Sequence, residues 1–250
     1  MAARTYALAN QKGGVGKTTT AINLAACLAE AGERALVVDL DPQANATSGL
    51  GMKANGTSTY DLLDGAPLHD LAKPTRFANL FLVPSRPELA GAAVELSRRA
   101  DGERYLAEAL ARVEGFDFVL LDCPPSLGPL TVNALAAADR VIVPVQTEYY
   151  ALEGLAQLVQ SINLVKVRLN PRLAIAGVLL TMADTRTRLS AEVEAEVRRH
   201  FGGLVFEAVV PRSVRVAEAP SHGLPVTHYD RRSRGADAYW KVAMELVERR

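Results

Sequence analysis

Residues 11–19 read Gln11-Lys12-Gly13-Gly14-Val15-Gly16-Lys17-Thr18-Thr19 and follow a short apolar run at residues 5–10. Residues 18–31 then carry alanines and leucines at helical spacing, and Gly32 is placed to end a helix. In the order strand, glycine-rich turn, helix, backbone N–H groups and the positive end of the helix can surround an anion. This stretch therefore predicts a phosphate-binding loop.

The rest of the chain alternates strand-like and helix-like stretches. Strands are expected at residues 34–40, 80–84, 116–121, 141–145, 175–182 and 205–210, and helices at residues 105–113, 132–137, 155–167 and 191–200. Apolar strands separated by helices indicate an α/β fold with a doubly wound, mostly parallel sheet flanked by helices. Residues 46–73 are expected to be loop with one short helix at 60–63. We expect residues 1–250 to form a single domain.

The composition is that of an ordinary globular protein. Of the 250 residues 49% are hydrophobic and 22% are charged, which allows a sizeable core. Two cysteines, Cys27 and Cys123, are too few for a disulfide framework. No run approaches the ~18 apolar residues of a membrane span, and the N-terminus lacks the apolar core of a signal peptide. We therefore expect a cytoplasmic protein without a membrane partner.

The two lysines of the loop have different expected roles. Lys17 can reach the β- and γ-phosphates of a nucleotide, and the Thr18 hydroxyl is placed to ligate Mg²⁺. The general pattern G-x-x-x-x-G-K-[ST] requires glycine at position 11, where this chain has Gln11 followed by Lys12. We expect Lys12 to reach a nucleotide across a two-fold interface, as an arginine finger does in trans. A solvated surface lysine is the alternative.

Two acidic segments complete the predicted site. Asp39 and Asp41 lie at i and i+2 at the end of one strand, so their side chains project to the same side. Asp122 ends another apolar strand. Ligands of open α/β sheets sit at the carboxyl ends of the strands, so Lys17, Asp41 and Asp122 should converge there. We assign Asp122 to Mg²⁺ through water and Asp39 to a supporting role. Asp41 is assigned to the Mg²⁺ site and to positioning or deprotonating the attacking water.

Several strings resemble a known family. Those at 12–20 (Lys-Gly-Gly-Val-Gly-Lys-Thr-Thr-Thr), 39–43 (Asp-Leu-Asp-Pro-Gln) and 121–126 (Leu-Asp-Cys-Pro-Pro-Ser) resemble the deviant Walker motifs of the ParA/MinD superfamily. Those at 144–146 (Pro-Val-Gln), 148–155 (Glu-Tyr-Tyr-Ala-Leu-Glu-Gly-Leu), 211–215 (Pro-Arg-Ser-Val-Arg) and 218–223 (Glu-Ala-Pro-Ser-His-Gly) resemble the Soj branch of ParA chromosome-partitioning ATPases. The resemblance spans nearly the whole chain and implies a P-loop NTPase of the deviant Walker A type.

That resemblance implies an ATPase with ATP and Mg²⁺ as cofactors. Such a protein forms a homodimer when ATP-bound, binds double-stranded DNA without sequence preference, and hydrolyses ATP when a ParB/Spo0J-type centromere-binding protein stimulates it, which releases the DNA. It would be cytoplasmic and nucleoid-associated.

The resemblance also carries the family's site onto this chain. The family's signature lysine, phosphate lysine and catalytic aspartate map onto Lys12, Lys17 and Asp41, and its magnesium residues onto Thr18 and Asp122. The nucleotide would contact Lys12, Gly13, Gly14, Val15, Gly16, Lys17, Thr18 and Thr19, with the adenine near Met182 and Pro211.

Adenine can also be argued from the residues. A common P-loop GTPase carries Asn-Lys-x-Asp after a late strand, where this chain has Thr181-Met182-Ala183-Asp184. The sequence therefore favours adenine over guanine.

The formal charge of zero conceals an uneven distribution. Residues 1–165 contain 13 basic and 18 acidic residues, and residues 166–250 contain 15 and 10. Arginine suits phosphate contacts, so the later part is expected to bind the DNA backbone with steep salt dependence. The candidates are Arg186, Arg188, Arg212 and Arg215. For any one of them, a solvated or salt-bridged side chain is the alternative.

Three other classes of protein would show different features. A MinD-like membrane ATPase would have a lysine-rich amphipathic C-terminal helix, whereas residues 236–250 indicate a helix docked on the domain. An iron–sulfur relative would need at least two well-placed cysteines per subunit, which Cys123 alone cannot supply. A binding module would hold ATP as a structural switch without turnover, and substituting Asp41 would change nothing.

Overall fold

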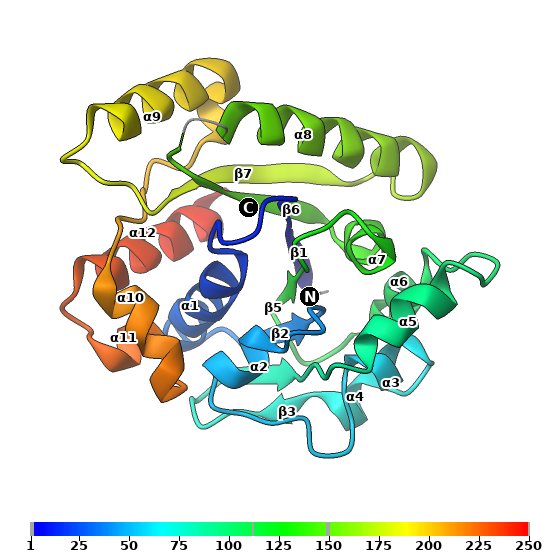
Figure 1. Cartoon of the computed structure of the whole chain (residues 1–250). Coiled ribbons are helices and arrows are strands. Elements are labelled where there is room, and N and C mark those ends of the chain that lie inside the picture. Colours follow the sequence, from blue (N-terminus) through cyan, green and yellow to red (C-terminus); the bar gives the residue numbers. More distant parts are fainter. Residues whose placement is uncertain (1–2, 112, 149–150, 250) are drawn as a thin grey trace.

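The computed structural model describes residues 3–111, 113–148 and 151–249 (Figure 1). The described residues form one sheet of seven strands in the order β3-β4-β2-β5-β1-β6-β7. The strands are β1 (Arg4–Leu8), β2 (Ala35–Asp39), β3 (Lys73–Pro74), β4 (Leu80–Val83), β5 (Phe118–Asp122), β6 (Arg140–Gln146) and β7 (Ala174–Thr181). Neighbouring strands pair in parallel except for β3 with β4. The predicted mostly parallel, doubly wound sheet is confirmed.

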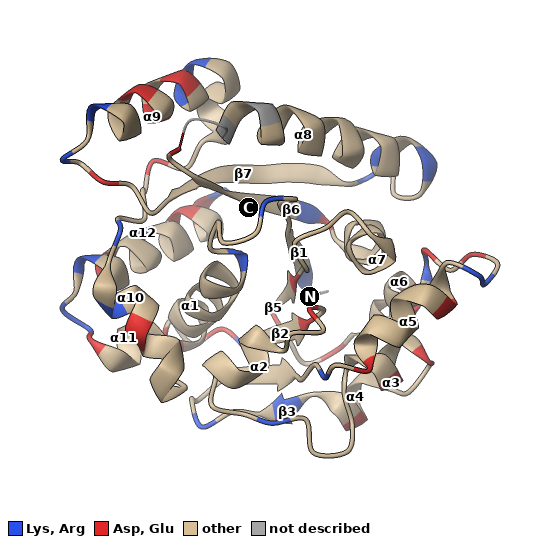
Figure 2. Ribbon diagram, in the orientation of Figure 1, with Lys and Arg blue, Asp and Glu red and all other residues tan. Residues whose placement is uncertain are grey.

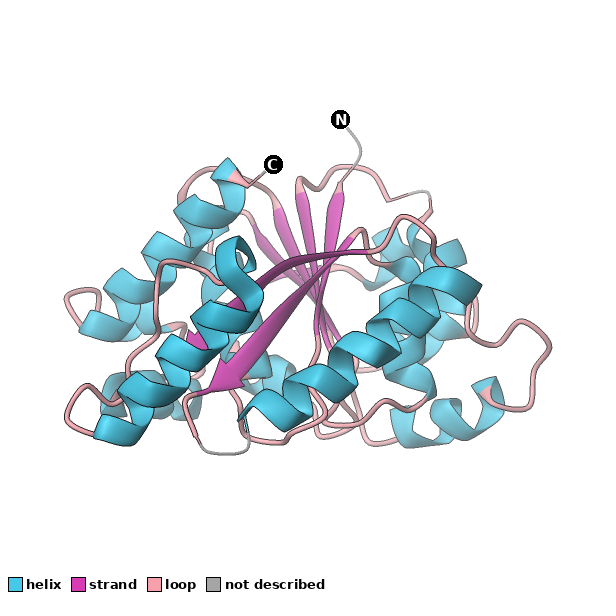
Figure 3. Cartoon of the chain, turned by 90° about the horizontal axis from the view of Figure 1, so that it is seen from above, coloured by secondary structure: helices cyan, strands magenta, loops and turns pink. Residues whose placement is uncertain are grey.

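Helices cover both faces of the sheet (Figures 1 and 3). One face packs against α1 (Lys17–Glu30), α2 (Asn45–Gly49), α10 (Val214–Glu218), the 3₁₀ turn η2 (Ala219–His222), α11 (Val226–Tyr229) and α12 (Arg234–Glu248). The other packs against α3 (Thr59–Leu63), α4 (Leu68–Leu71), α5 (Leu89–Leu96), α6 (Tyr105–Leu110), α7 (Pro129–Ala137), α8 (Ala151–Arg168) and α9 (Arg188–Phe201), which the 3₁₀ turn η1 (Gly202–Leu204) follows.

The inner strands of the sheet are mostly apolar because both of their faces are covered. In β1, Tyr6 and Leu8 join the core on the α1 side, whereas Ala7 faces the opposite core. Successive side chains of a strand point to opposite faces, so in a strand that is covered on both sides every side chain faces a core and apolar residues are favoured. This is the physical basis of the continuous apolar runs in the sequence.

The predicted strand at residues 205–210 is wrong. Val205 pairs with Val178 of β7 as an isolated bridge only. The N–H groups of Glu207 and Ala208 donate to the Glu245 carboxylate of α12, at 2.9 and 3.2 Å. Phe206 and Val210 still donate to the Val178 and Leu180 carbonyls of β7, at 3.0 and 2.9 Å. Because a distant helix supplies the acceptors for the residues between them, the segment forms no continuous ladder with β7, and its apolar pattern could not reveal this.

Residues 46–73 contain more structure than the predicted loop with one short helix. They include most of α2, all of α3 and α4, and the first residue of β3. Helix α5 lies further on and was not predicted either. These helices are too short to show a clear helical period, so sequence patterns miss them.

The C-terminal helix α12 docks on the domain, as its sequence indicates. Tyr239, Val242 and Leu246 are buried in the core that α12 shares with α1. None of the helices among the described residues combines the length and apolarity needed to cross a membrane.

Candidate nucleotide-binding site

The predicted motifs meet at the carboxyl ends of the central strands. Strand β5 lies between β1 and β2, and Asp122 is in register with both Leu8 and Asp39. A cavity of about 400 Å³ opens at this edge. It is lined by Gly13, Gly14, Gly16, Lys17, Thr18, Thr19, Ile22, Asp41, Asn45, Ser48, Pro125, Met182 and Pro220.

The glycine-rich loop is anchored to strands β6 and β7. The Asn10 side chain donates to the carbonyl of Pro144 at 2.8 Å and accepts from the Lys12 N–H at 3.0 Å. The Thr181 hydroxyl donates to the carbonyl of Val15 at 2.9 Å. Gly16 precedes α1 with φ of 87°, a conformation that glycine adopts without strain. The loop therefore presents the N-terminus of α1 to the cavity, where unpaired N–H groups favour an anion.

Lys17 is the buried cation of the site. Its side chain is almost enclosed, and its Nζ donates to the carbonyl of Lys12 at 3.2 Å. Burial lowers the pKa of Lys17, although the charge of Asp122 opposes this shift. A phosphate in the cavity would offer this amine a better acceptor than a neutral carbonyl, because hydrogen bonds between charged groups are stronger.

Asp122 is completely buried, and neither of its carboxylate oxygens has a hydrogen-bond partner among the described residues. Burial raises the pKa of Asp122 well above its usual range, and the charge of Asp39 adds to this. The Thr18 hydroxyl is near enough to oppose the shift without making a hydrogen bond of good geometry. A buried unpaired carboxylate is costly unless a cation compensates it. Carboxylate and hydroxyl oxygens of Asp122, Asp41 and Thr18 are the donors that Mg²⁺ prefers, so the site fits this ion.

Asp39 organises the turn that carries Asp41. Its carboxylate accepts from the Asp41 N–H at 3.1 Å, from the Thr47 N–H at 2.8 Å and from the Thr47 hydroxyl at 2.7 Å. The Thr47 hydroxyl in turn accepts from the Ser85 N–H at 2.9 Å. Burial raises the pKa of Asp39 to about 6, against the effect of these hydrogen bonds. Asp39 thus ties β2 to α2 and holds the start of the Asp41 turn.

Lys12 does not line the cavity. Its Nζ lies 2.9 Å from Oε2 of Glu148 in the same chain, and both side chains are partly exposed to solvent. The expectation that Lys12 acts across an interface stays a prediction. Tyr149 and Tyr150 of the same motif lie outside the described residues.

The two residues predicted near adenine are placed differently. Met182 lines the cavity, with φ of 52°, which is uncommon for a residue other than glycine. Pro211 instead forms an isolated bridge with Ala183 and is not among the lining residues, where Pro220 is found. The contacts of both with adenine remain predictions.

Comparisons with known proteins identify the family of this chain. A family model described as an AAA domain matches residues 3–175. The chromosome-partitioning ATPase Soj of Thermus thermophilus is 56% identical over 98% of this chain and 96% of its own length. The sporulation initiation inhibitor protein Soj of Bacillus subtilis is 52% identical over 96% and 97%. The chain belongs to the Soj/ParA family of chromosome-partitioning ATPases.

A solved relative of this ATPase family contains a nucleotide. The crystal structure named as cobyrinic acid a,c-diamide synthase from Mycobacterium smegmatis, with bound ADP and magnesium, is 38% identical over 98% of this chain and 94% of that one, with a TM-score of 0.86. The reaction in this name belongs to the mycobacterial protein and is not assigned to the present chain. The similarity supports the shared fold and nucleotide binding. ATP and Mg²⁺ are accordingly the cofactors of this Soj/ParA member.

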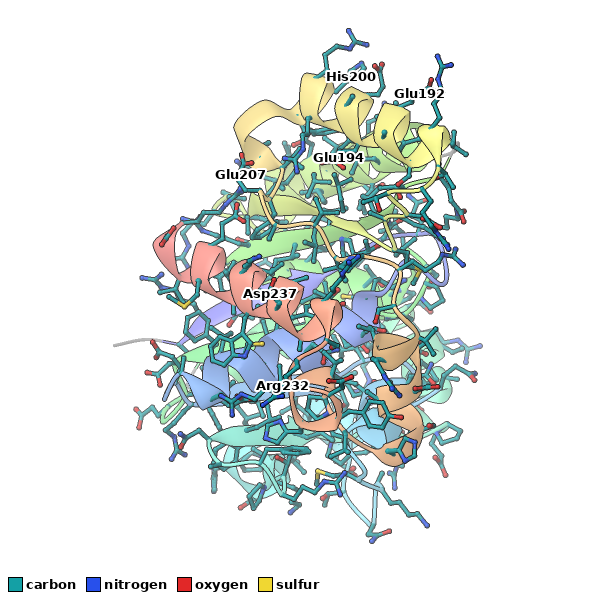
Figure 4. All side chains as sticks on the ribbon, turned by 90° about the vertical axis from the view of Figure 1, so that its left-hand side faces the viewer. Glu192, Glu194, His200, Glu207, Arg232 and Asp237 are labelled. Carbon is teal, nitrogen blue, oxygen red and sulfur yellow. The ribbon has the colours of Figure 1, made fainter. Side chains whose placement is uncertain are left out.

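The arginines predicted to bind DNA lie at the start of α9 and around α10 (Figure 2). Three of the four pair with carboxylates of their own chain. Arg186 donates twice to Asp184 at 2.8 and 2.7 Å, which holds the pKa of that carboxyl well below its usual range. Arg188 lies 2.7 Å from Glu192 (labelled in Figure 4), and Arg215 lies 3.3 Å from both Glu218 and Asp230.

Arg186, Arg188 and Arg215 therefore form salt bridges within the chain, which was the alternative to DNA contact for each of them. Arg186 and Arg188 nevertheless keep 83% and 92% of their side-chain surface exposed. Exposed pairs of this kind are weak, so phosphate groups can compete for these arginines. Arg212 is exposed, and its contact with DNA is likewise a prediction.

Sequence reasoning missed five lining residues of this Soj/ParA site, Ile22, Asn45, Ser48, Pro125 and Pro220. Ile22 lies in α1, and Pro125 follows β5. Asn45 and Ser48 belong to the five-residue helix α2, and Pro220 to η2. Such short elements leave no periodic signal, and only the Asp-Pro turn after β2 could have pointed to α2. Asp39 was expected to support the site, but nothing in the sequence indicated Thr47 or Ser85 as its partners.

Proposed function

We propose that residues 1–250 act as one DNA-segregating ATPase domain. It binds ATP and Mg²⁺, closes into a homodimer around the nucleotides, and in that form binds double-stranded DNA without sequence preference. A ParB-type partner then stimulates hydrolysis and the DNA is released, so the protein cycles on and off the nucleoid in the cytoplasm. The observation that carries the proposal is the unpaired, buried Asp122 beside Lys17 and the glycine loop, which calls for a metal ion and a polyphosphate together.

The loop residues would hold the phosphates. Backbone N–H groups from Gly13 to Thr19 bind phosphate oxygens, and Lys17 exchanges the Lys12 carbonyl for a phosphate oxygen. Thr18, Asp41 and Asp122 would hold Mg²⁺, directly or through water. When bound, the ion neutralises charge on the phosphates.

Asp41 would orient the attacking water and take up its proton. The Asp39 carboxylate accepts a hydrogen bond from the Asp41 N–H at 3.1 Å, and the Asp41 carboxylate accepts one from the Gln43 N–H at 2.9 Å. A tight turn therefore limits where the Asp41 carboxylate can move. This is a positioning contribution, which matters because small misplacements are costly for catalysis.

Lys12 would stabilise the transferring phosphoryl group of the partner's nucleotide, and Met182 and Pro211 would lie near adenine. Arg186, Arg188, Arg212 and Arg215 would contact DNA phosphates. Because most of these arginines are already paired, one subunit attracts DNA weakly and a dimer presents twice as many of them. Binding should therefore depend on ATP and fall steeply with salt.

The direct test measures DNA co-sedimentation and ATPase rate with ATP or ADP, with and without a ParB-type partner, across a salt series. No ATP-dependent DNA binding at low salt would refute the proposal. Replacing both Arg186 and Arg215 by Glu should abolish DNA binding and preserve ATP-dependent dimerisation. The matched control is Arg98→Glu with Arg104→Glu, two exposed arginines between α5 and α6, which should bind DNA as the wild type does.

Asp41→Ala separates an ATPase from a binding module. It should bind ATP and fail to hydrolyse it, because Asp41 is the group that positions water. Turnover equal to that of the wild type would contradict the role of Asp41.

A further inference from the structure

Glu148 belongs to the Soj-like motif at residues 148–155 and contacts Lys12 of the glycine-rich loop. Both of its carboxylate oxygens have a partner. Oε2 is 2.9 Å from Nζ of Lys12, 136 residues away in sequence, and Oε1 accepts from the side-chain amide of Gln146 at 2.6 Å. The Glu148 N–H also donates to the Gln146 carbonyl at 2.8 Å. Gln146, the last residue of β6, thus presents this carboxylate to Lys12 from a rigid strand.

Lys12 is engaged at its backbone as well. Its N–H donates to the Asn10 side chain at 3.0 Å, and its carbonyl accepts from Lys17 at 3.2 Å. The residue is therefore fixed at three points, of which only the ion pair with Glu148 involves its own charge. An amine held in this way points to its own subunit and not to a neighbouring one.

We propose that Glu148, oriented by Gln146, is a positioning residue that restrains Lys12 within its own subunit until the partner's nucleotide replaces the carboxylate. The inference rests on the proposed function, in which Lys12 acts across the dimer interface. It assigns a role to Glu148 in the timing of dimerisation.

The exposure of the pair sets the strength of this restraint. The side chains of Lys12 and Glu148 keep 43% and 46% of their surface exposed, and a pair so exposed shifts an equilibrium by about 2- to 5-fold. A triphosphate carries several charges and displaces one carboxylate readily. Closing a dimer releases two such lysines, so the restraint lowers the association constant by about 4- to 25-fold in total.

Amine labelling tests the ion pair without any nucleotide. The full chain and its Glu148→Gln variant are treated with an amine-reactive ester, and labelling of each lysine is measured by mass spectrometry. Lys12 should label about 2- to 5-fold faster in the variant, while Lys73 and Lys166 stay unchanged. The matched control is Asp237→Asn on α12 (Figure 4), which frees Lys241 from an exposed pair of 2.7 Å and should leave Lys12 unaffected.

Sedimentation of the same proteins with a non-hydrolysable ATP analogue tests the restraint. Glu148→Gln should dimerise with an association constant about 4- to 25-fold above that of the wild type and of Asp237→Asn. Glu148→Asp, which keeps the charge on a shorter side chain, should lie between them.

Unchanged labelling of Lys12 would overturn the proposal, because Glu148 would then not hold the amine. Faster labelling with equal or weaker dimerisation would also overturn it, since Glu148 would then act within the dimer. Failure of the wild-type chain to dimerise would instead refute the proposed function, and the labelling would still decide whether Glu148 holds Lys12.

Discussion

Thr47→Val should destabilise the chain by about 3 kcal/mol, although it changes one buried hydroxyl to a methyl of nearly the same size. The hydroxyl donates to the Asp39 carboxylate at 2.7 Å and accepts from the Ser85 N–H at 2.9 Å. A hydrogen bond to a charged group contributes about 1.5–3 kcal/mol, and a buried donor left without an acceptor costs about 1–3 kcal/mol. For a chain of this size 1 kcal/mol lowers the melting temperature by about 2–4 °C, so we expect a decrease of about 6–12 °C.

The loss should also depend on pH, because it acts on a carboxylate. Burial raises the pKa of Asp39 to about 6, above its usual value of 3.8, so the folded chain holds this proton more tightly than the unfolded chain. Stability therefore decreases as pH rises from about 4 to 6. Removing the Thr47 hydroxyl raises the pKa of Asp39 further, which extends this decrease to higher pH. The difference between the two proteins should be larger at pH 7.5 than at pH 5.

Denaturant unfolding of both proteins at pH 5 and 7.5, followed by circular dichroism, measures these quantities. The control is Ser48→Ala in the same helix, whose exposed hydroxyl makes a 3.3 Å bond to the Asn45 carbonyl and should matter by less than about 0.5 kcal/mol. If Thr47→Val costs no more than this control, or costs the same at both pH values, the reasoning about Asp39 is refuted.

Two further substitutions test the site and the packing. Asp122→Asn should stabilise the chain by about 1–3 kcal/mol without nucleotide, because a buried unpaired charge is removed. The stabilisation should be larger at pH 8 than at pH 5. When ATP and Mg²⁺ are added, the melting temperature of the variant should rise less than that of the wild type. A loss of stability at pH 8 without nucleotide would argue against an unpaired charge at this position. Gly235→Ala should cost about 1–3 kcal/mol in thermal unfolding, since the added Cβ would lie 2.2 Å from Cγ2 of Val216. Its control, Gly91→Ala in α5, meets no atom within 4 Å and should be neutral or stabilising; equal effects of the two would contradict the packing argument.

Local patterns predicted the elements that carry the chemistry to within a residue or two. Helix α1 was expected at 18–31 and runs from Lys17 to Glu30, and β5 was expected to end beside Asp122 and ends on it. These features follow from neighbouring residues: a glycine that tolerates positive φ, a helical repeat, and an apolar run bounded by a charge. The segment at residues 205–210 forms no continuous strand, because Glu245, a side chain distant in sequence, accepts from the N–H groups of Glu207 and Ala208 in its middle.

The sequence alone was enough for the order of strand, loop and helix, and for the glycines, lysines and aspartates that lie at the ends of the strands. Short-range spacing specifies all of these, because each depends on a few consecutive residues. Only the folded chain decided which charges are compensated. The Asp39–Thr47 bond, the Lys12–Glu148 pair and the carboxylates beside the arginines predicted to bind DNA join side chains whose meeting depends on packing. No local pattern records a distance between separate segments. Asp122 shows the same division, because its position could be read from the sequence, whereas its lack of a partner is a property of the packed core.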